Sequence, residues 1–212
     1  WPRPERVSAA RYPRPWGAGP ALCSVVEAAD PTLAGELIGE ELRAGADGVW
    51  LRFDRTTRLG PESGDGGPSS DGVAVHHGTD LAAALAGLTG GERSAPRQLW
   101  LDAGANALPL AALWLAYNER RALPDGAVAV HLAADPLAAL ARDGELPRDL
   151  TKLSSEMAAL VRFCAGRLPG SSAIGVTTVT HHEAGADPVQ ELAFTVATLL
   201  EYVRRLADSG PS

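Results

Sequence analysis

Short apolar runs alternate with longer amphipathic segments along most of the chain. The runs have the length and the residue types of buried strands, and they lie at 48–53, 72–76, 98–102, 127–132 and 176–180. Segments with apolar residues at helical spacing separate or follow them, at 31–44, 80–88, 108–121, 136–141, 153–168 and 188–203. Strands and helices that alternate in this way are typical of parallel βαβ units, and about five such units are predicted.

The stretch from Gly175 to Tyr202 contains the clearest local pattern. A strand over 176–180 leads into the polar corner His181-His182-Glu183, and an amphipathic helix begins after Pro188. In (β/α) barrels, side chains at the carboxyl ends of the strands carry the chemistry. The corner is therefore a candidate functional site.

Five βα units fit two architectures. A closed (β/α) barrel has eight units and typically about 250 residues, whereas this chain has 212. The alternation therefore predicts an α/β fold, either an open doubly wound sheet or a parallel (β/α) barrel that lacks its last units. Residues 1–30, rich in Pro and Arg, are predicted to form an extended N-terminal arm ahead of one barrel-type domain over 31–208.

Charge and composition disfavour several classes of function. The net charge of −7 and the pI near 5.2 argue against a nucleic acid or an anionic membrane as partner. No apolar run approaches the roughly 20 residues that span a bilayer, and the N-terminus lacks the apolar core of a secretory signal. Cys23 and Cys164 match neither a metal-binding spacing nor a disulfide framework. We therefore expect a cytoplasmic protein that binds neither nucleic acid nor membrane.

Ionisable residues gather at the predicted strand ends. Histidines and carboxylates that converge on one barrel rim can bind a divalent metal and activate water, as in a metal-dependent hydrolase. Their spacing matches no established metal motif, so we predict no metal ligands and keep the hydrolase as an alternative. The residues in question are Asp54, His76, His77, Asp102, His131, His181, His182 and Glu183.

Several segments, in the same order along the chain, are similar to one enzyme family. Arg14-Pro15-Trp16 resembles the RPW of its substrate-channel segment, and Leu42–Thr57 resembles its first helix end and strand. Asn106–Leu113 is similar to the helix after the family's third strand. The most specific match is Glu183–Ala186 with Gln190–Thr195, which is close to the family's EAGA and QELAFT. The chain thus resembles the N-terminal barrel domain of adenosylcobalamin-dependent methylmalonyl-CoA mutases.

The resemblance implies a TIM barrel whose axis is threaded by the pantetheine of coenzyme A. It also implies a separate cobalamin-binding domain that caps the rim, and a radical rearrangement whose chemistry the cofactor supplies. No DxHxxG cobalamin signature occurs in this sequence, so the chain itself is expected to bind no cofactor.

The sequence departs from the family pattern at the positions that face substrate. The Tyr-His pair that ends the family's fifth strand falls on Val179 and Thr180. The family's fourth strand ends in TIQND, of which this chain keeps only Asp135. We therefore expect no catalytic residues, only a degenerate rim that consists of His131, Asp135, His181, His182 and Glu183.

The resemblance implies a catalytically silent chain, like the small subunit of two-chain members of this family. Such a chain would stabilise, as a heterodimer, a catalytic large subunit that holds adenosylcobalamin and interconverts methylmalonyl-CoA and succinyl-CoA. An unclosed sheet leaves edge strands that invite association, so we expect the chain to be a fragment or another chain to complete or cover its barrel. A catalytically active acyl-CoA mutase chain is the remaining alternative, and whether this chain is itself an enzyme stays open.

Overall fold

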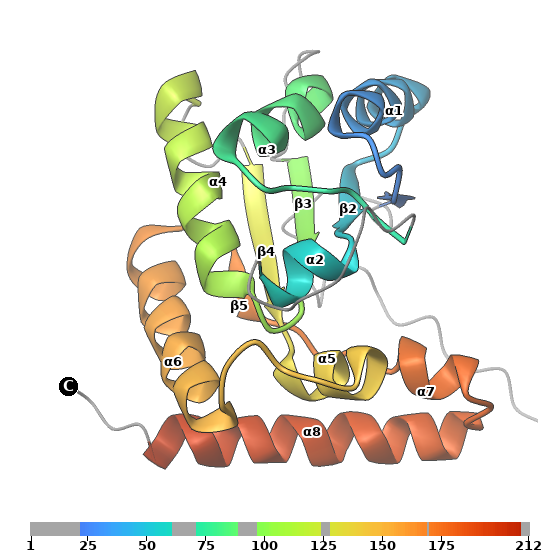
Figure 1. The fold of residues 1–212 in the computed structure, drawn as a ribbon, viewed down its shortest axis with the longest axis vertical. Coiled ribbons are helices and arrows are strands. Elements are labelled where there is room, and N and C mark those ends of the chain that lie inside the picture. Colours follow the sequence, from blue (N-terminus) through green and yellow to red (C-terminus); the bar gives the residue numbers. More distant parts are fainter. Residues whose placement is uncertain (1–21, 61–70, 89–96, 124–127, 169, 209–212) are drawn as a thin grey trace, which may run out of the picture.

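A five-stranded parallel sheet forms the centre of the structure, a computed structural model that describes residues 22–60, 71–88, 97–123, 128–168 and 170–208. The strands are β1 (Cys23–Val26), β2 (Gly48–Arg52), β3 (Arg97–Asp102), β4 (Val128–Ala134) and β5 (Ser172–Ile174). Each strand pairs in parallel with the next one along the chain, so their order in space is β1-β2-β3-β4-β5 (Figure 1).

Helices connect the strands and continue beyond the last one (Figure 1). They are α1 (Pro31–Ala44), α2 (Arg55–Leu59), α3 (Gly78–Ala84), α4 (Ala107–Arg121), α5 (Pro136–Asp143), α6 (Leu150–Arg167), α7 (Val179–Glu183) and α8 (Pro188–Asp208), with a 3-10 turn η2 (Ala86–Leu88) after α3. Among the described residues, no helix combines the length and the apolar character needed to cross a membrane.

The strand order distinguishes between the two architectures that the sequence leaves open. A doubly wound sheet reverses its order at a switch point and carries helices on both faces. Here the order is sequential, and right-handed crossovers between sequential parallel strands place their helices on one face of the sheet. This is the arrangement of a (β/α) barrel, of which the described strands form an arc. The prediction of a partial parallel barrel is therefore confirmed.

The two faces of the sheet differ in burial. On β2, Val49 and Leu51 are fully buried in the core, whereas Trp50 and Arg52 lie on the opposite face and are half-buried. This alternation follows from the two-residue period of a strand. The hydrophobic core accordingly lies between the sheet and the helices, and includes Ile38 of α1 along with residues of α3, α4 and α6. The second face is the inner side of the barrel arc.

Two aspartates place helix starts at the carboxyl edge of the sheet. Asp54 follows β2 and accepts a hydrogen bond from the Thr57 N–H at 2.9 Å, at the start of α2. Asp135 follows β4 and accepts from the Ala138 N–H at 3.1 Å, at the start of α5. Each carboxylate satisfies one of the N–H groups that the first turn of a helix leaves unpaired. The polar residues that follow these strands are therefore held at the edge of the sheet.

Residues 72–76, predicted to be a strand, do not form one. Their one strand-like pairing is an isolated bridge between Val73 and Phe53, the residue that follows β2. The N–H of Ala74 bonds to the Ala29 carbonyl at 3.1 Å, and the N–H of Val75 bonds to the Thr57 hydroxyl at 2.9 Å. Because these donors bond to two separate segments, no continuous ladder forms. The additional strand is β1, at the end of the predicted N-terminal arm, most of which lies outside the described residues.

The strand predicted at 176–180 also differs in the structure. β5 has three residues and ends before this run, and Val179 opens α7. The N–H of Thr177 donates to Asp135 Oδ2 at 2.8 Å, and the N–H of Val179 donates to the Thr177 hydroxyl at 3.3 Å. Side chains thus accept the hydrogen bonds that a continuing strand would give to β4. The β-branched run therefore becomes an irregular segment followed by a short helix.

Candidate functional site

A cavity of about 150 Å³ lies at the carboxyl edge of the sheet. Residues of β1, β2, the ends of β3 and β4, α5 and the α7 segment line it. They are Val25, Trp50, Arg52, Asp102, Gly104, Asp135, Ala138, Ala139, Arg142, Thr177, Val179, Thr180 and Glu183. Barrel enzymes place their active sites at this edge, so the cavity is the candidate functional site.

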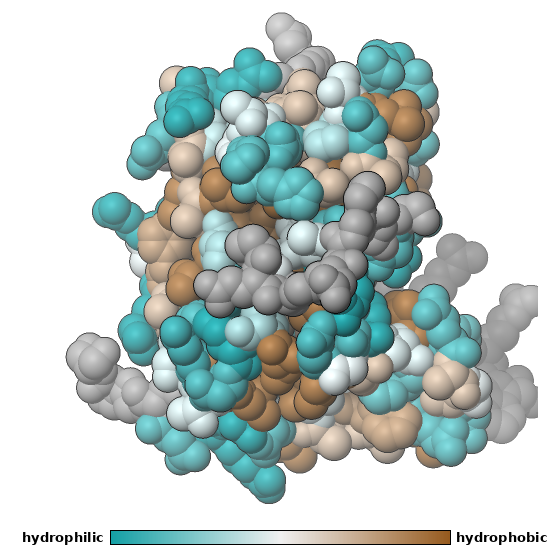
Figure 2. All heavy atoms as spheres, in the orientation of Figure 1, coloured by the Kyte–Doolittle hydropathy of each residue, from teal (hydrophilic) through white to brown (hydrophobic). Residues whose placement is uncertain are grey.

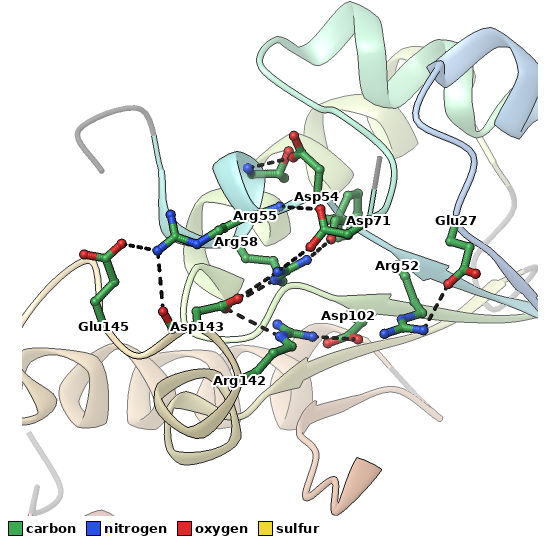
Figure 3. Close-up of polar contacts among 12 residues, drawn as sticks. Glu27, Arg52, Asp54, Arg55, Arg58, Asp71, Asp102, Arg142, Asp143 and Glu145 are labelled. Atoms are coloured by element: carbon green, nitrogen blue, oxygen red, sulfur yellow. Dashed lines mark hydrogen bonds and ion pairs between the residues drawn. The ribbon is translucent and has the colours of Figure 1, made fainter. Parts of the chain in front are cut away.

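Arg58, on α2, is the centre of a buried ion-pair network beside the cavity (Figure 3). Its guanidinium donates to Asp143 at 2.8 Å and to Asp71 at 2.9 Å. The side chains of Arg58 and Asp143 are only 4% and 3% exposed. Burial lowers the pKa of the guanidinium, but the hydrogen bonds to the two carboxylates outweigh burial, and the net pKa is raised. Arg58 therefore stays charged and ties α2 to the end of α5.

The two arginines that line the cavity also contact carboxylates. Arg142 contacts Asp102 at 3.4 Å and Asp143 at 3.5 Å, and Arg52 contacts Glu27 at 3.0 Å (Figure 3). The Arg142–Asp102 pair is half-buried, whereas Arg52 and Glu27 are 35% and 58% exposed. The arginine charges of the cavity are thus compensated by carboxylates of the same chain. This arrangement holds the edge of the sheet together and leaves less positive charge to attract an anionic substrate.

Asp135, predicted at the degenerate rim, lines the cavity and is held by several hydrogen bonds. It accepts from the N–H groups of Ala138 and Thr177, at 3.1 and 2.8 Å, and from the Tyr202 hydroxyl. Burial raises the pKa of Asp135, although these hydrogen bonds act in the opposite direction. Burial and the Asp135 charge also raise the pKa of Tyr202. The oxygens of Asp135 therefore cap α5 and anchor α8.

Val179 and Thr180, at the positions that the resemblance assigns to the Tyr-His pair, both line the cavity. Glu183, at the other end of α7, lines it as well. The cavity and the resemblance thus indicate the same place in the fold. An isopropyl group has no hydrogen-bond donor, and a threonine hydroxyl does not titrate near neutral pH as imidazole does. That these two residues perform no catalysis stays a prediction.

His131 lies within the sheet and is not among the residues that line the cavity. Its two ring nitrogens contact Ser172 Oγ and Gln98 Oε1, each at 2.8 Å. Its ring stacks on Trp100, with the ring centroids 4.3 Å apart. Burial lowers the pKa of His131, which favours the neutral imidazole. The residue therefore bridges β3, β4 and β5.

His181 and His182 contact α8. The His181 ring stacks on Phe194 with the centroids 4.3 Å apart, and His182 Nδ1 lies 2.8 Å from Glu191 Oε1. The hydrogen bond to Glu191 and its charge raise the pKa of His182, and the same hydrogen bond lowers the pKa of Glu191. Within the described part of the chain, no three His, Cys, Asp or Glu side chains are grouped to hold a metal ion. The hydrolase alternative therefore gains no support.

Sequence reasoning misses the arginines of this site. For Arg52 a signal exists, because alternation along β2 places it on the same face as Trp50, away from the buried positions. For Arg58 and Asp143 no local signal exists, because the two residues are 85 positions apart in the sequence. The Arg14-Pro15-Trp16 match lies outside the described residues.

Comparisons with known proteins identify the family. The family model described as methylmalonyl-CoA mutase matches residues 13–211. The chain is 41% identical over 110 residues to the methylmalonyl-CoA mutase small subunit of Streptomyces virginiae. It is 38% identical over 109 residues to the protein of the same name from Propionibacterium freudenreichii subsp. shermanii. These alignments cover 52% and 51% of this chain but only 17% and 16% of the two relatives.

A third relative carries the name of a different mutase and of a large subunit. It is the 2-hydroxyisobutanoyl-CoA mutase large subunit of Aquincola tertiaricarbonis, 26% identical over 170 residues, which are 78% of this chain and 30% of the relative. The match to the family model includes every residue that lines the cavity and the whole of α8. The chain therefore belongs to the methylmalonyl-CoA mutase family.

Proposed function

We propose that the chain is a catalytically silent, small-subunit-like component of a methylmalonyl-CoA mutase assembly. The observation that carries the proposal is the pair Val179 and Thr180 on the cavity wall, where the family pattern has Tyr and His. Neither side chain can act as a general acid or base near neutral pH. The names of two relatives, both mutase small subunits, support the same role.

The partner in this proposal is a catalytic large subunit, in a cytoplasmic heterodimer that interconverts methylmalonyl-CoA and succinyl-CoA. The family implies adenosylcobalamin, but the described residues of this chain do not fit it. The cavity of about 150 Å³ is below the roughly 300–1,000 Å³ typical of sites for much smaller ligands. We therefore assign the cofactor to the partner chain.

The contribution of this chain is structural. The Arg58–Asp143 pair and the Asp135–Tyr202 contact join α2, α5 and α8 at one edge of the sheet. Because these contacts are made within the chain, they do not depend on a bound ligand. A preorganised surface loses little conformational entropy when a partner chain binds. This property suits a subunit that stabilises another subunit.

A reconstitution experiment tests the proposal. The tagged chain is mixed with a mutase large chain from the same host, and size-exclusion chromatography with light scattering measures the complex. We expect a 1:1 complex in which the large chain melts at a higher temperature, and no binding of methylmalonyl-CoA to the isolated small chain by calorimetry. If no complex forms, the partner role is wrong. Tight acyl-CoA binding by the isolated chain, or turnover by it with added adenosylcobalamin, would overturn the silent role.

Paired substitutions in the complex sharpen this test. Val179→Ala with Thr180→Ala should leave turnover within about twofold of the native complex, because neither residue takes part in proton transfer. The matched control replaces the Tyr-His pair of the large chain with Val-Thr, which should abolish turnover. A loss of more than about tenfold in the first variant, with the complex intact, would place catalysis on this chain.

A further inference from the structure

One row of side chains runs across the inner face of the sheet, from β1 to β5. The strand register aligns one residue from each strand, in the order Val25, Trp50, Trp100, His131 and Ser172. The strand neighbours of Trp50, Trp100 and His131 all belong to the hydrophobic core on the helix side of the sheet. Because side chains alternate between the two faces of a strand, these three rings lie on the inner side of the barrel arc.

Contacts hold the rings of this row in place. The His131 ring stacks on Trp100, and its two nitrogens contact Ser172 Oγ and Gln98 Oε1, each at 2.8 Å. The imidazole therefore cannot turn away without losing contacts to three strands. Trp50 Nε1 is buried, although it has no hydrogen-bond partner among the described residues, so packing covers this edge of the indole.

The cavity lies on the carboxyl side of the row. Trp50 lines it, and so do Arg52 and Asp102, which lie two residues beyond the row on β2 and β3. Trp100 and His131 do not belong to the lining. The cavity thus ends at the Trp50 indole, and the row separates it from the amino edge of the sheet.

We propose that Trp50, Trp100 and His131 close the inside of the barrel arc, so that this chain has no path for the pantetheine arm that the family resemblance implies. The interior of an eight-stranded barrel is just wide enough for side chains to fill. An extended arm along the axis therefore needs small side chains at every level of the interior. Here three neighbouring strands each place a large ring in the same row.

The closed interior limits what the cavity receives. A ligand that enters from the carboxyl edge ends at the Trp50 indole, so a short group of acyl size fits and a pantetheine arm does not. The wall on the α5 side is apolar, with Ala138 and Ala139. Hydrophobic residues also reach the surface along the edge of the molecule where α5 and α8 lie (Figures 1 and 2).

The closed interior deepens the proposed function, and it rests on that proposal in placing the substrate site of this chain at the cavity. Val179 and Thr180, on α7, lack the chemistry of the family pair, whereas the row lies on the strands and blocks the coenzyme arm. The test of the row uses this chain alone and measures neither turnover nor complex formation. Its failure and the failure of the proposed function are therefore separate results.

Disulfide tethering tests the row. In a Cys23→Ser background, Thr180→Cys places a thiol on the cavity wall, and the buried Cys164 is left in place. The protein is equilibrated with equal amounts of the disulfides of pantetheine and of N-acetylcysteamine, which has the same thiol end without the long arm. The introduced thiolate attacks either disulfide, forms one mixed disulfide and releases one thiol. Mass spectrometry measures the ratio of the two adducts.

The ratio depends on whether the arm finds room in the interior. With both tryptophans in place, we expect the pantetheine adduct to exceed the other less than about threefold. Trp50→Ser combined with Trp100→Ser should raise the ratio at least about fivefold, because the arm then packs in the opened interior. The matched control, Trp50→Phe combined with Trp100→Phe, keeps large rings and should leave the ratio unchanged. Circular dichroism verifies that the variants fold.

Two results would overturn the closed interior. One is a preference for pantetheine of about threefold or more while both tryptophans are present, which would show an open path. The other is a rise of less than about fivefold in the serine variant, which would show that the indoles do not close the interior. If the double serine variant does not fold, Trp50→Ser alone is compared with Trp50→Phe by the same criteria.

Discussion

The Tyr202 hydroxyl, near the end of α8, donates a hydrogen bond to Asp135, which caps α5 at the end of β4. The same hydroxyl oxygen accepts from the Leu137 N–H at 3.0 Å. All residues of α8 are described, and among them Tyr202 is the one that is buried. This contact therefore orients α8 on the domain. It also joins the cavity wall, to which Asp135 belongs, to α8.

The substitution Tyr202→Phe keeps the buried ring and removes the hydroxyl. It leaves an Asp135 oxygen and the Leu137 N–H without this partner, so we expect the free energy of unfolding to fall by about 1–3 kcal/mol. Urea unfolding followed by circular dichroism measures the loss. In a double-mutant cycle with Asp135→Asn, the double variant should lose less unfolding free energy than the sum of the losses in the two single variants. Strict additivity would mean that hydroxyl and carboxylate do not interact.

Arg58→Met removes a buried cation and leaves the buried Asp143 carboxylate poorly compensated. Because an uncompensated buried charge is costly, we expect a loss of about 3–5 kcal/mol in unfolding free energy. The matched control is Arg52→Met, which breaks a pair whose side chains are 35% and 58% exposed. The control should lose less than about 1 kcal/mol. Similar losses in both variants would contradict the network around Arg58.

The buried His131 predicts a dependence of stability on pH. Burial lowers the pKa of His131 from its usual 6.5. The unfolded state therefore binds a proton more readily than the folded state does. The contribution of the neutral ring to the free energy of unfolding is fully present above about pH 6.5, and it is lost as the pH falls through the lowered pKa. The urea midpoint of the native chain should fall between about pH 7 and about pH 5. His131→Gln should reduce this fall, and an equal fall in the variant would assign it to other groups.

The exposed pair of His182 and Glu191 predicts a titration of opposite sign. Glu191 raises the pKa of His182 above 6.5, so the contact contributes fully below that pH and is lost as the pH rises through the raised pKa. NMR titration of the imidazole resonances measures the shift directly. In Glu191→Gln the pKa of His182 should return toward 6.5, while the resonances of His131, on another element, stay unchanged. If the pKa of His182 is the same in the native chain and in Glu191→Gln, the contact is not formed in solution.

Periodicity predicted the longer helices well, although not the short helices α2 and α7, because helical spacing is a local property that several turns are needed to reveal. The pattern over 31–44 became α1 (Pro31–Ala44), and the pattern over 108–121 became α4 (Ala107–Arg121). The family assignment also rested on local runs, above all Glu183–Ala186 and the segment that follows it. A sequence similarity within one segment can be recognised without knowing which other segments it packs against.

The two predicted strands that did not form show the limit of local patterns. Residues 72–76 and 176–180 have β-branched side chains, yet their backbone donors bond to Thr57, Ala29 and Asp135. Strand propensity reflects the fit of a side chain to a sheet surface, and it does not identify the acceptor of each N–H group. The acceptors come from distant parts of the chain.

The residues expected at the rim of the candidate site also fall into two groups, those that line the cavity and those that do not. Asp135 and Glu183 lie on the cavity wall, as expected for rim residues, whereas His131 stacks within the sheet and His181 and His182 contact α8. Position at a strand end indicates which residues approach the edge. Which of them face the cavity depends on where the short helix α7 turns the chain.

The sequence by itself determined the alternation of helices and strands and the family, and it predicts that Val179 and Thr180 take the places of the family's Tyr-His pair. Only the tertiary structure decided the sequential strand order and the pairing of Arg58 with Asp143 and of Tyr202 with Asp135. The physical reason is that helical periodicity acts between near neighbours in the chain. Ion pairs, buried hydrogen bonds and burial depend on distances between segments that lie far apart in the sequence.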